Sequence, residues 1–327
     1  MSGPIVKESK VMPQSSLEQS HTMQYANKLK NNGIIQITGE ERAKYLQGQI
    51  TADIDVLKDN NALLSCHCNF KGKIWSVFFT FAWQDSILLI THNSVLAQSL
   101  SELNKYGVFA KVDISDRSND WQITGGAGEI FENAVKEVFG ALPVGDRVVI
   151  SSTDGLVMSV EQPEQRYLVL QPSNAKKHLN CSATEDDKQW EIADIKSGLG
   201  DIRISSVDEY VPQMLNLQSL NAIDFAKGCY MGQEVVARTK YLGRNKRAGF
   251  ILKTDSTTDD NLSGEQLEYQ IGENWRPGGK ILRSGSDGDQ TWIFAVLAKD
   301  TEIGVSFRVK SLQSLIFVTQ ALPYPLQ

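Results

Sequence analysis

The helical pattern of this 327-residue chain stops at Ala248, and this break constrains the fold more than any other feature of the sequence. Before it, segments with apolar residues at helical spacing are interspersed with β-rich runs. After it, only short β-rich runs remain, separated by glycine-rich turns, which is typical of a small barrel. We therefore predict a C-terminal β-barrel with strands at 250–252, 267–271, 279–282, 292–297, 307–309 and 315–318.

The residues before the break combine helices and hairpins without the strict strand–helix alternation of a doubly wound parallel sheet, which favours α+β architecture. Predicted helices span 40–50, 95–106 and 129–139, and a further helix is expected to start near Asn174. Predicted strands span 33–38, 63–68, 74–82, 87–92 and 109–114, with others at Trp121 and near Val148, Val157 and Leu168.

The composition, 41% hydrophobic and 22% charged, is that of an ordinary globular protein. No run approaches the roughly 18 apolar residues needed to cross a bilayer, so no membrane partner is expected. Residues 1–24 lack the apolar core of a secretory signal and the arginines of a transit peptide, and we expect a mobile tail in a cytoplasmic protein. The four cysteines include no C-x-x-C pair, which favours reduced thiols.

The segment K-G-C-Y-M-G-Q-E, residues 227–234, holds the main candidate for chemistry. If a helix begins at about Tyr230, the Cys229 thiol lies at its positive end with Lys227 two residues away, and both features favour the thiolate. Such a sulfur can attack an electrophile, ligate a metal or cluster, or form a mixed disulfide. The alternative is a small buried side chain in a tight turn. Supporting residues of the motif are Gly228, Tyr230, Gly232, Gln233, Glu234 and Arg238.

Gly232 carries a separate expectation. A glycine inside a helix is unfavourable, so its presence indicates that another backbone or a ligand comes close at this position.

The segment S-C-H-C-N suggests a metal site, but strand geometry argues against one. Alternate side chains of a strand point to opposite faces, so Cys66 and Cys68 share one face and His67 takes the other. No second Cys/His pair at zinc spacing completes a site. We predict buried thiols and assign no metal, with Cys68 as a minor candidate for meeting Cys229 in space.

A run of cations follows the motif: Arg238, Lys240, Arg244, Lys246 and Arg247, with no acidic residue among them. These cations can neutralise RNA phosphates or the polyglutamate tail of a folate, or they form a solvated loop. The net charge of −6 opposes long-range attraction of a polyanion as large as tRNA, which favours the folate tail.

The segment 211–248, with K-G-C-Y-M-G-Q-E at its centre, resembles the signature of the YgfZ family, the folate-binding relatives of the glycine-cleavage T-protein. The stretches ITGEERAKYLQGQITADI, CHCNFKGKIWS and ENWRPGGKIL resemble further parts of the same family. The resemblance implies two ferredoxin-like α+β subdomains and a C-terminal barrel around a central folate cleft. The predicted units are 1–24, a tail; 25–115 with 185–240, the folate-binding core; 116–184, a second α+β subdomain; and 241–327, the barrel.

The same resemblance implies an accessory protein that binds tetrahydrofolate or another reduced folate and supports assembly or repair of iron–sulphur enzymes, including those that thiolate tRNA. In that family the hallmark cysteine, which matches Cys229, is the functional residue, and a cluster ligand role is open to it. The alternatives are a folate-dependent aminomethyl transferase and a factor that contacts tRNA directly.

Departures from the family patterns bear on this choice. Ser76 and Val77 stand where T-proteins carry acidic residues, one of them catalytic, which disfavours an enzyme. Lys196 replaces the glutamate of E-A-G that pairs with pterin N–H groups, and Asn32 replaces a tryptophan that lines the cleft in some members. Trp190 remains as a ring on which a pterin can stack.

Overall fold

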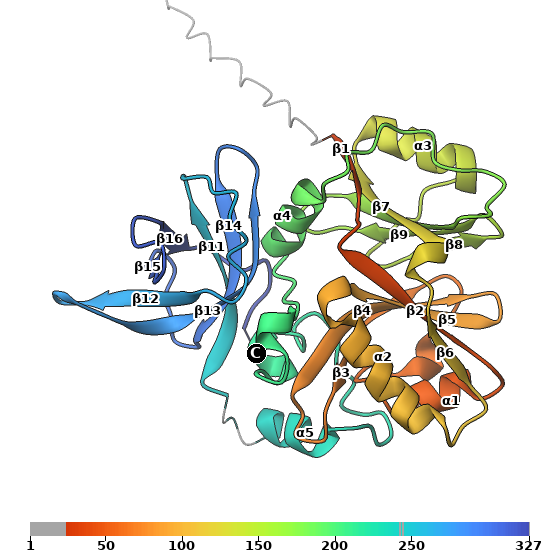
Figure 1. Cartoon of the computed structure of the whole chain (residues 1–327), viewed down its shortest axis with the longest axis horizontal. Coiled ribbons are helices and arrows are strands. Elements are labelled where there is room, and N and C mark those ends of the chain that lie inside the picture. The colour runs from red at the N-terminus through yellow and green to blue at the C-terminus, as the bar shows by residue number, and fades with distance from the viewer. Residues whose placement is uncertain (1–23, 242, 244, 327) are drawn as a thin grey trace, which may run out of the picture.

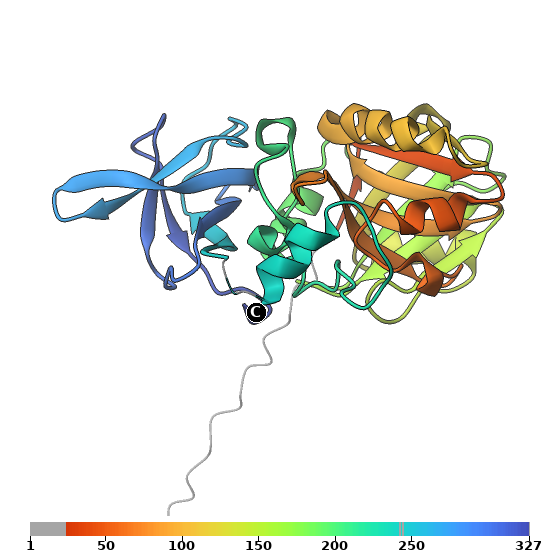
Figure 2. The same ribbon diagram turned by 90° about the horizontal axis from the view of Figure 1, so that it is seen from below.

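The computed structural model describes residues 24–241, 243 and 245–326, which form two antiparallel sheets and a closed barrel around helix α4 (Lys188–Lys196). Figure 1 shows the barrel on the left, the two sheets on the right and α4 between them, and Figure 2 shows the same arrangement from below. This confirms the α+β architecture with a C-terminal barrel. Within the described residues, no helix is long and apolar enough to span a membrane.

The first sheet has five strands in the order β3-β4-β5-β2-β6. Their bounds are β2 Asn32–Thr38, β3 Ala62–Cys68, β4 Ile74–Trp83, β5 Ser86–His92 and β6 Asp113–Asp116. Helices α1 (Arg42–Gln47) and α2 (Asn93–Gly107) pack on one face, where Ile35 and Ile37 are buried against them. Alternation along β2 turns Ile34 to the opposite face, toward the second sheet.

The second sheet has the order β1-β7-β10-β9-β8, with helix α3 (Glu129–Phe139) against it. Its strands are β1 Tyr25–Lys28, β7 Trp121–Ala127, β8 Val149–Ser152, β9 Gly155–Val160 and β10 Arg166–Pro172. Strand β1 pairs antiparallel with β7, so residues 25–28 belong to the second sheet although they precede the first sheet in the sequence. Ile34, Phe81 and Leu88 of the first sheet share one buried core with Leu156 and Leu168 of the second.

The barrel closes in the order β11-β14-β13-β12-β15-β16, and each of the six predicted strands overlaps one of these. Their bounds are β11 Arg247–Thr254, β12 Gln266–Ile271, β13 Asn274–Ser286, β14 Thr291–Ala298, β15 Ser306–Val309 and β16 Ile316–Thr319. Phe250, Leu252 and Phe307 belong to the apolar barrel core. Alternating residues, among them Ile251 and Phe294, lie in the core that joins the barrel to α4 and β3.

The prediction of a helix that starts near Asn174 is wrong. Side chains accept the backbone N–H groups of this segment, which follows a non-helical path. The Asp154 carboxylate accepts the backbone N–H of Lys176 at 2.7 Å and of Lys177 at 3.3 Å, and Gln171 accepts that of Leu179 at 2.9 Å. The next helix is α4, starting at Lys188. The remaining short elements are η1 Ile54–Val56, η2 Ser118–Asp120, η3 Ile204–Ser206 and η4 Pro212–Leu215.

Helix α5 (Gln233–Tyr241) begins three residues later than Tyr230, where the sequence predicted it. Gly232 precedes this helix with a φ of +82°. A Cβ there would lie 2.5 Å from the carbonyl oxygen of Asn69 and 2.9 Å from Cα of Gly72, in the β3–β4 turn. The prediction that another backbone approaches Gly232 is therefore confirmed, although the glycine lies ahead of the helix instead of inside it.

We expect Gly232→Ala to lower the free energy of unfolding by about 2 kcal/mol or more. The added Cβ would sit on a residue with a left-handed φ and would clash with the backbone of the β3–β4 turn. The control is Gly228→Ala. Gly228 has no left-handed φ, and beyond its chain neighbours no atom lies within 4 Å of the point where its Cβ would stand, so we expect a change within about 0.5 kcal/mol. Chemical denaturation measures both, and equal stabilities of the two variants would contradict the close approach.

Candidate functional site

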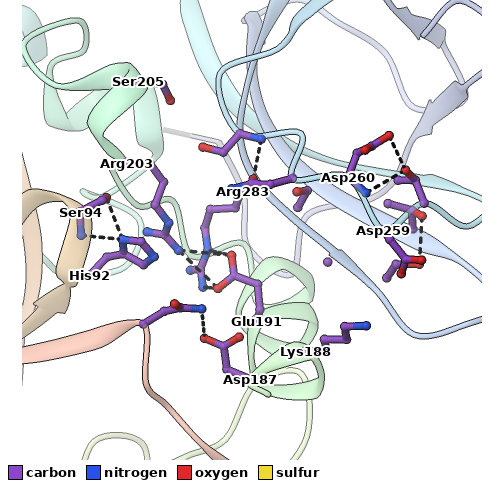
Figure 3. A pocket seen from close by; sticks show the side chains of 18 of the residues that line it. His92, Ser94, Asp187, Lys188, Glu191, Arg203, Ser205, Asp259, Asp260 and Arg283 are labelled. Carbon is purple, nitrogen blue, oxygen red and sulfur yellow. Dashed lines mark hydrogen bonds and ion pairs between the residues drawn. The ribbon is translucent and has the colours of Figure 1, made fainter. Parts of the chain in front are cut away.

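A cavity of about 370 Å³ opens between α4, the β5–α2 corner and the barrel (Figure 3). Its walls are strongly charged. Figure 3 shows Arg203 and Arg283 converging on Glu191, with Asp187 and Lys188 on the same helix end and Asp259 and Asp260 on the barrel side. We call this space the outer cavity.

An inner chamber of about 40 Å³ shares five wall residues with the outer cavity: His92, Asp187, Glu191, Arg203 and Arg283. Its remaining walls come from both sheets, α4 and the segment after it, and they include Asn32, Val77, Phe79, Leu168, Trp190, Asp194 and Leu199. The chamber has room for a few water molecules at most.

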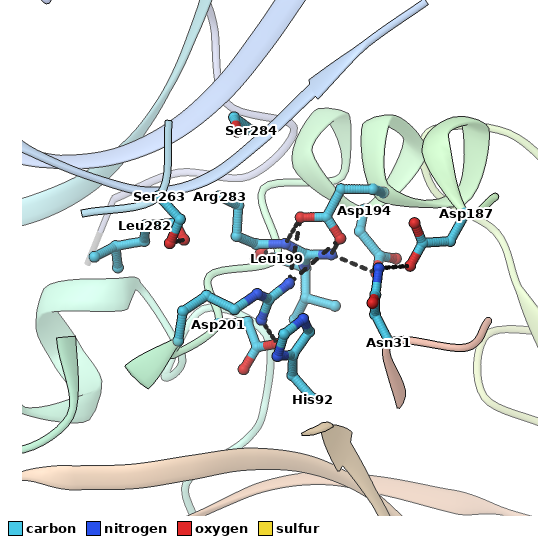
Figure 4. A network of polar contacts seen from close by, with 12 residues as sticks. Asn31, His92, Asp187, Asp194, Leu199, Asp201, Ser263, Leu282, Arg283 and Ser284 are labelled. Carbon is cyan, nitrogen blue, oxygen red and sulfur yellow. Dashed lines mark hydrogen bonds and ion pairs between the residues drawn. The ribbon is translucent and has the colours of Figure 1, made fainter. Parts of the chain in front are cut away.

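Buried guanidinium groups and carboxylates connect the walls of these two spaces (Figure 4). The Arg283 side chain, 3% exposed, donates to both Glu191 oxygens at 2.8 and 2.6 Å and to Asp194 at 2.9 Å. Arg166 of β10 donates to the other Asp194 oxygen at 2.7 Å. Arg203 donates to Glu191 at 3.3 Å and pairs with Asp201. One network therefore ties the barrel and the second sheet to α4.

These contacts shift the protonation equilibria of the network. Burial alone would raise the pKa of Glu191, but Arg283 and Arg203 overcome it and hold that pKa at about 2. Burial raises the pKa of Asp187, whose carboxylate accepts from Asn31 at 2.9 Å. Burial also lowers the pKa of His92 to about 4, and the neutral ring accepts the Ser94 N–H at Nδ1.

This network was not predicted from the sequence. A signal was present: Glu191 and Asp194 are spaced i, i+3 on α4, so they share one helix face. Their partners Arg166, Arg203 and Arg283 come from three distant segments, and no sequence pattern joins them.

Cys229 lies on the surface, exposed, in the loop that leads to α5. This excludes the alternative of a small buried side chain. The helix that was expected to polarise the thiol begins only at Gln233. The space where a Gly228 side chain would stand is open, and Cys229 lines neither the outer cavity nor the inner chamber. The thiol therefore faces solvent, apart from the central cavities.

Lys227 anchors this loop to the protein. Its buried ammonium donates to the backbone carbonyls of Gln47, Ile50 and Ala52 at 2.8, 2.9 and 2.6 Å. Burial lowers its pKa to about 8, opposed by the charges of Asp53 and Asp224. All three ammonium protons can be used by these carbonyls, so the geometry gives Lys227 a structural task and not a contact with the thiol.

The remaining cysteines lie in the interior or away from the loop. Cys66 and Cys68 are fully buried in the central core, and His67 faces α2, where Nδ1 lies 3.0 Å from Ser99 Oγ, as strand alternation predicted. All four cysteines are free, so no disulfide joins the buried Cys68 to the exposed Cys229. Within the described residues, no group of three or more Cys, His, Asp or Glu is arranged to hold a metal ion.

The residues predicted to contact folate occupy different places. Asn32 and Trp190 line the inner chamber. Trp190 is 5% exposed, packs on Gly125 and carries the Arg166 guanidinium 4.2 Å from its ring centroid. Lys196 points to the barrel, where its ammonium lies 4.5 Å from the ring centroid of Trp292, and it lines neither central space.

Val77 and Ser76 lie on opposite faces of β4. Val77 lines the inner chamber, whereas the Ser76 hydroxyl donates to Ser99 at 2.9 Å on the α2 side.

The cationic run lies on and after α5, and none of its described members lines the outer cavity or the inner chamber. Arg238 forms an ion pair with Glu234. The Lys240 ammonium lies 3.8 Å from the ring centroid of Phe225, and both residues line a separate cavity of about 320 Å³. Arg244 lies outside the described residues. This placement does not favour the expected contact of these cations with the tail of a folate bound in the outer cavity or the inner chamber.

The whole arrangement is that of a T-protein-like fold. The crystal structure of the glycine cleavage system aminomethyltransferase T from Bartonella henselae superposes with a TM-score of 0.69 and 12% identity, over 93% of this chain and 87% of that one. Residues 245–312 match the family model described as YgfZ, beta-barrel domain.

Two curated relatives show to which family within this fold the chain belongs. The chain is 39% identical over 299 residues to the tRNA-modifying protein YgfZ of Yersinia enterocolitica and 38% identical to that of Yersinia pseudotuberculosis, each over 90% of both chains. The chain belongs to the YgfZ family.

The depressed pKa of Glu191 predicts an acid-dependent loss of stability. Its carboxylate has a pKa of about 2 when folded and 4.5 as an ordinary glutamate, so its contribution is complete above pH 4.5 and is lost as the pH falls toward 2. We expect the unfolding free energy of the wild type to fall by about 3 kcal/mol more across this window than that of Glu191→Gln. Denaturant titrations at a series of pH values measure this difference, and parallel curves would contradict it.

Proposed function

We propose that this chain is a cytoplasmic, folate-binding accessory protein of tRNA modification, whose Cys229 thiol serves iron–sulphur enzymes, including those that thiolate tRNA. The observation that carries the proposal is the loop of residues 227–234. Lys227, Tyr230 and Gly232 fix it against the first sheet, while Cys229 alone of the four cysteines is exposed. The relatives are named tRNA-modifying protein, which supports the choice of tRNA modification as the pathway.

We assign the folate to the outer cavity. Its volume of about 370 Å³ lies in the range of small-molecule sites, about 300–1,000 Å³, whereas the inner chamber is too small for a pterin ring. Lys188 at its wall suits the carboxylates of a folate tail. Stacking on Trp190 stays a prediction, and it requires the inner chamber to widen. When bound, a reduced folate supplies a carrier for one-carbon groups.

Asp187 is the carboxylate best suited to pair with pterin N–H groups. It lines both spaces, and among the described residues its one side-chain hydrogen-bond partner is Asn31, whereas Glu191 and Asp194 are engaged by guanidinium groups. This assigns to Asp187 the acceptor role that Lys196 cannot fill.

An aminomethyl transferase is the less favoured function. The resemblance to T-proteins implies acidic residues at positions 76 and 77 for that activity, whereas this chain has Val77 facing the chamber and Ser76 facing away. The acids that do line the chamber include Glu191, Asp194 and Asp201, each paired with arginine. Glu191, whose pKa is held at about 2, is a poor proton acceptor.

Replacing the thiol tests the proposal. Cys229→Ser should unfold at the wild-type temperature, because the side chain is exposed and the change in volume is small. In a strain lacking its own family member, we expect it to fail to restore thiolated tRNA and iron–sulphur enzyme activity, since a hydroxyl does not replace a thiolate. The matched control is Cys181→Ser, at a half-buried free cysteine, which should restore both. Full complementation by Cys229→Ser would refute the working thiol.

Folate binding has its own test. Isothermal titration calorimetry with tetrahydrofolate should show Asp187→Asn binding about tenfold more weakly than wild type, since a hydrogen bond to a charged group is lost. Lys196→Ala, which changes a residue outside both spaces, should bind as the wild type does. Equal loss in both variants, or none in either, would contradict the assignment to Asp187.

A further inference from the structure

Two exposed aromatic side chains flank the motif loop, each beside a lysine. Phe70, at the tip of the β3–β4 turn, is 75% exposed, and the Lys71 ammonium lies 5.5 Å from its ring centroid. Tyr241, at the end of α5, is 71% exposed, with the Lys240 ammonium 5.7 Å from its ring centroid. Neither ring takes part in a buried core among the described residues.

The two elements that carry these rings pack directly on each other. A Cβ on Gly72 of the turn would lie 3.0 Å from Cβ of Val235 in α5. On α5, Arg238 and Tyr241 lie opposite the buried Val236 and so point outward. We use the name α5 face for these exposed residues of the turn, of α5 and of the segment after it: Phe70, Lys71, Arg238, Lys240, Tyr241, Lys246 and Arg247.

The α5 face carries unbalanced positive charge. Within the described residues, no ion pair involves Lys71, Lys240, Lys246 or Arg247.

The neighbouring acids are already engaged. Glu234 pairs with Arg238, Glu209 pairs with Lys280, and Asp208 accepts from Asn69 at 2.7 Å. Asp224 accepts the backbone N–H groups of Ala226 and Lys227. The four cations without an ion pair outnumber the two of these acids that have only uncharged partners, Asp208 and Asp224, although the whole chain carries −6.

We propose that the α5 face binds a single-stranded segment or loop of RNA, with bases stacked on Phe70 and Tyr241 and phosphates paired with Lys71, Lys246 and Arg247. Exposed aromatic rings interleaved with cations are the pattern of single-strand binding, because each base offers a stacking face and each phosphate a charge. A duplex hides its base faces, so the rings favour unpaired nucleotides. The choice of RNA rests on the proposed function.

The position of the thiol fits this partner. Cys229 is three residues from Gly232, which touches the β3–β4 turn, so the thiol lies within about 10 Å of chain length from the residue that contacts the turn carrying Phe70. The folate tail, by contrast, offers no ring for Phe70 or Tyr241 and belongs to a cavity that the α5 face does not line.

Fluorescence anisotropy with the full chain tests the proposal, using a labelled RNA hairpin with an unpaired loop and a blunt RNA duplex of equal length. Phe70→Ala with Tyr241→Ala should weaken hairpin binding about tenfold or more, with an unchanged slope of log affinity against log salt. Lys71→Glu with Lys246→Glu should reduce that slope by roughly 1.4, since two phosphate contacts are lost. The duplex should bind more weakly than the hairpin.

The matched control is Phe109→Ala with Lys111→Glu, an exposed phenylalanine and lysine after α2 that lie away from the α5 face. It should bind the hairpin as the wild type does. Wild-type protein that binds no RNA, or binds the duplex as tightly, overturns the proposal, as does wild-type affinity of the Phe70/Tyr241 variant. Competition by pteroylpolyglutamate alone, without RNA binding, would assign the face to the folate tail.

Complementation separates this inference from the proposed function. If Cys229→Ser fails to complement while the α5-face variants bind the hairpin as wild type, the function stands and the RNA face is refuted. If Cys229→Ser complements while the α5-face variants lose hairpin binding, the RNA face stands and the thiol function is refuted.

Discussion

The contact of Arg283 with Glu191 and Asp194 is the interaction on which the arrangement of the three units depends. Arg283 comes from the barrel, the two acids from α4, and Arg166 carries the network into the second sheet. Removing one member of a buried ion network costs about 3–5 kcal/mol, because the partner charge is left without compensation. The site is therefore built from the same groups that hold the units together, and Glu191, whose pKa the two arginines hold at about 2, is a poor proton acceptor.

The outer cavity and the exposed Cys229 thiol lie in two separate parts of the structure. The Lys227 ammonium holds the motif loop on residues 47–52 of the first sheet unit, whereas the outer cavity lies at the start of α4 against the barrel. Leu64, Cys66 and Cys68 of β3 share a core with Ile195 and Leu199 beside the cavity. Continuous packing, and not a shared pocket, connects the two.

The sequence was sufficient for the barrel, for helix 129–139 and for strands β2, β3, β4 and β5 of the first sheet, since each has its own periodic pattern, whereas the strand predicted at 109–114 is observed at 113–116. It was insufficient where side chains distant in sequence determine the backbone path. Near Asn174, where a helix was predicted, Asp154 accepts backbone N–H groups and the segment is not helical. The motif identified Cys229 and the close approach at Gly232, but the lysine beside the thiol turned inward. Every residue has a backbone carbonyl, so the sequence could not predict that those of Gln47, Ile50 and Ala52 accept from the Lys227 ammonium.

Strand β1 has a consequence for the order in which the protein is made. Its hydrogen-bonding partners lie in β7 and at Thr184, where Lys28 N–H donates to the Thr184 carbonyl at 2.9 Å. During synthesis from the N-terminus, the first strand leaves the ribosome long before either partner exists. Contacts of such high sequence separation form slowly. The second sheet thus reaches completion only after translation has passed the first sheet entirely, and β1 stays an unpaired edge until then.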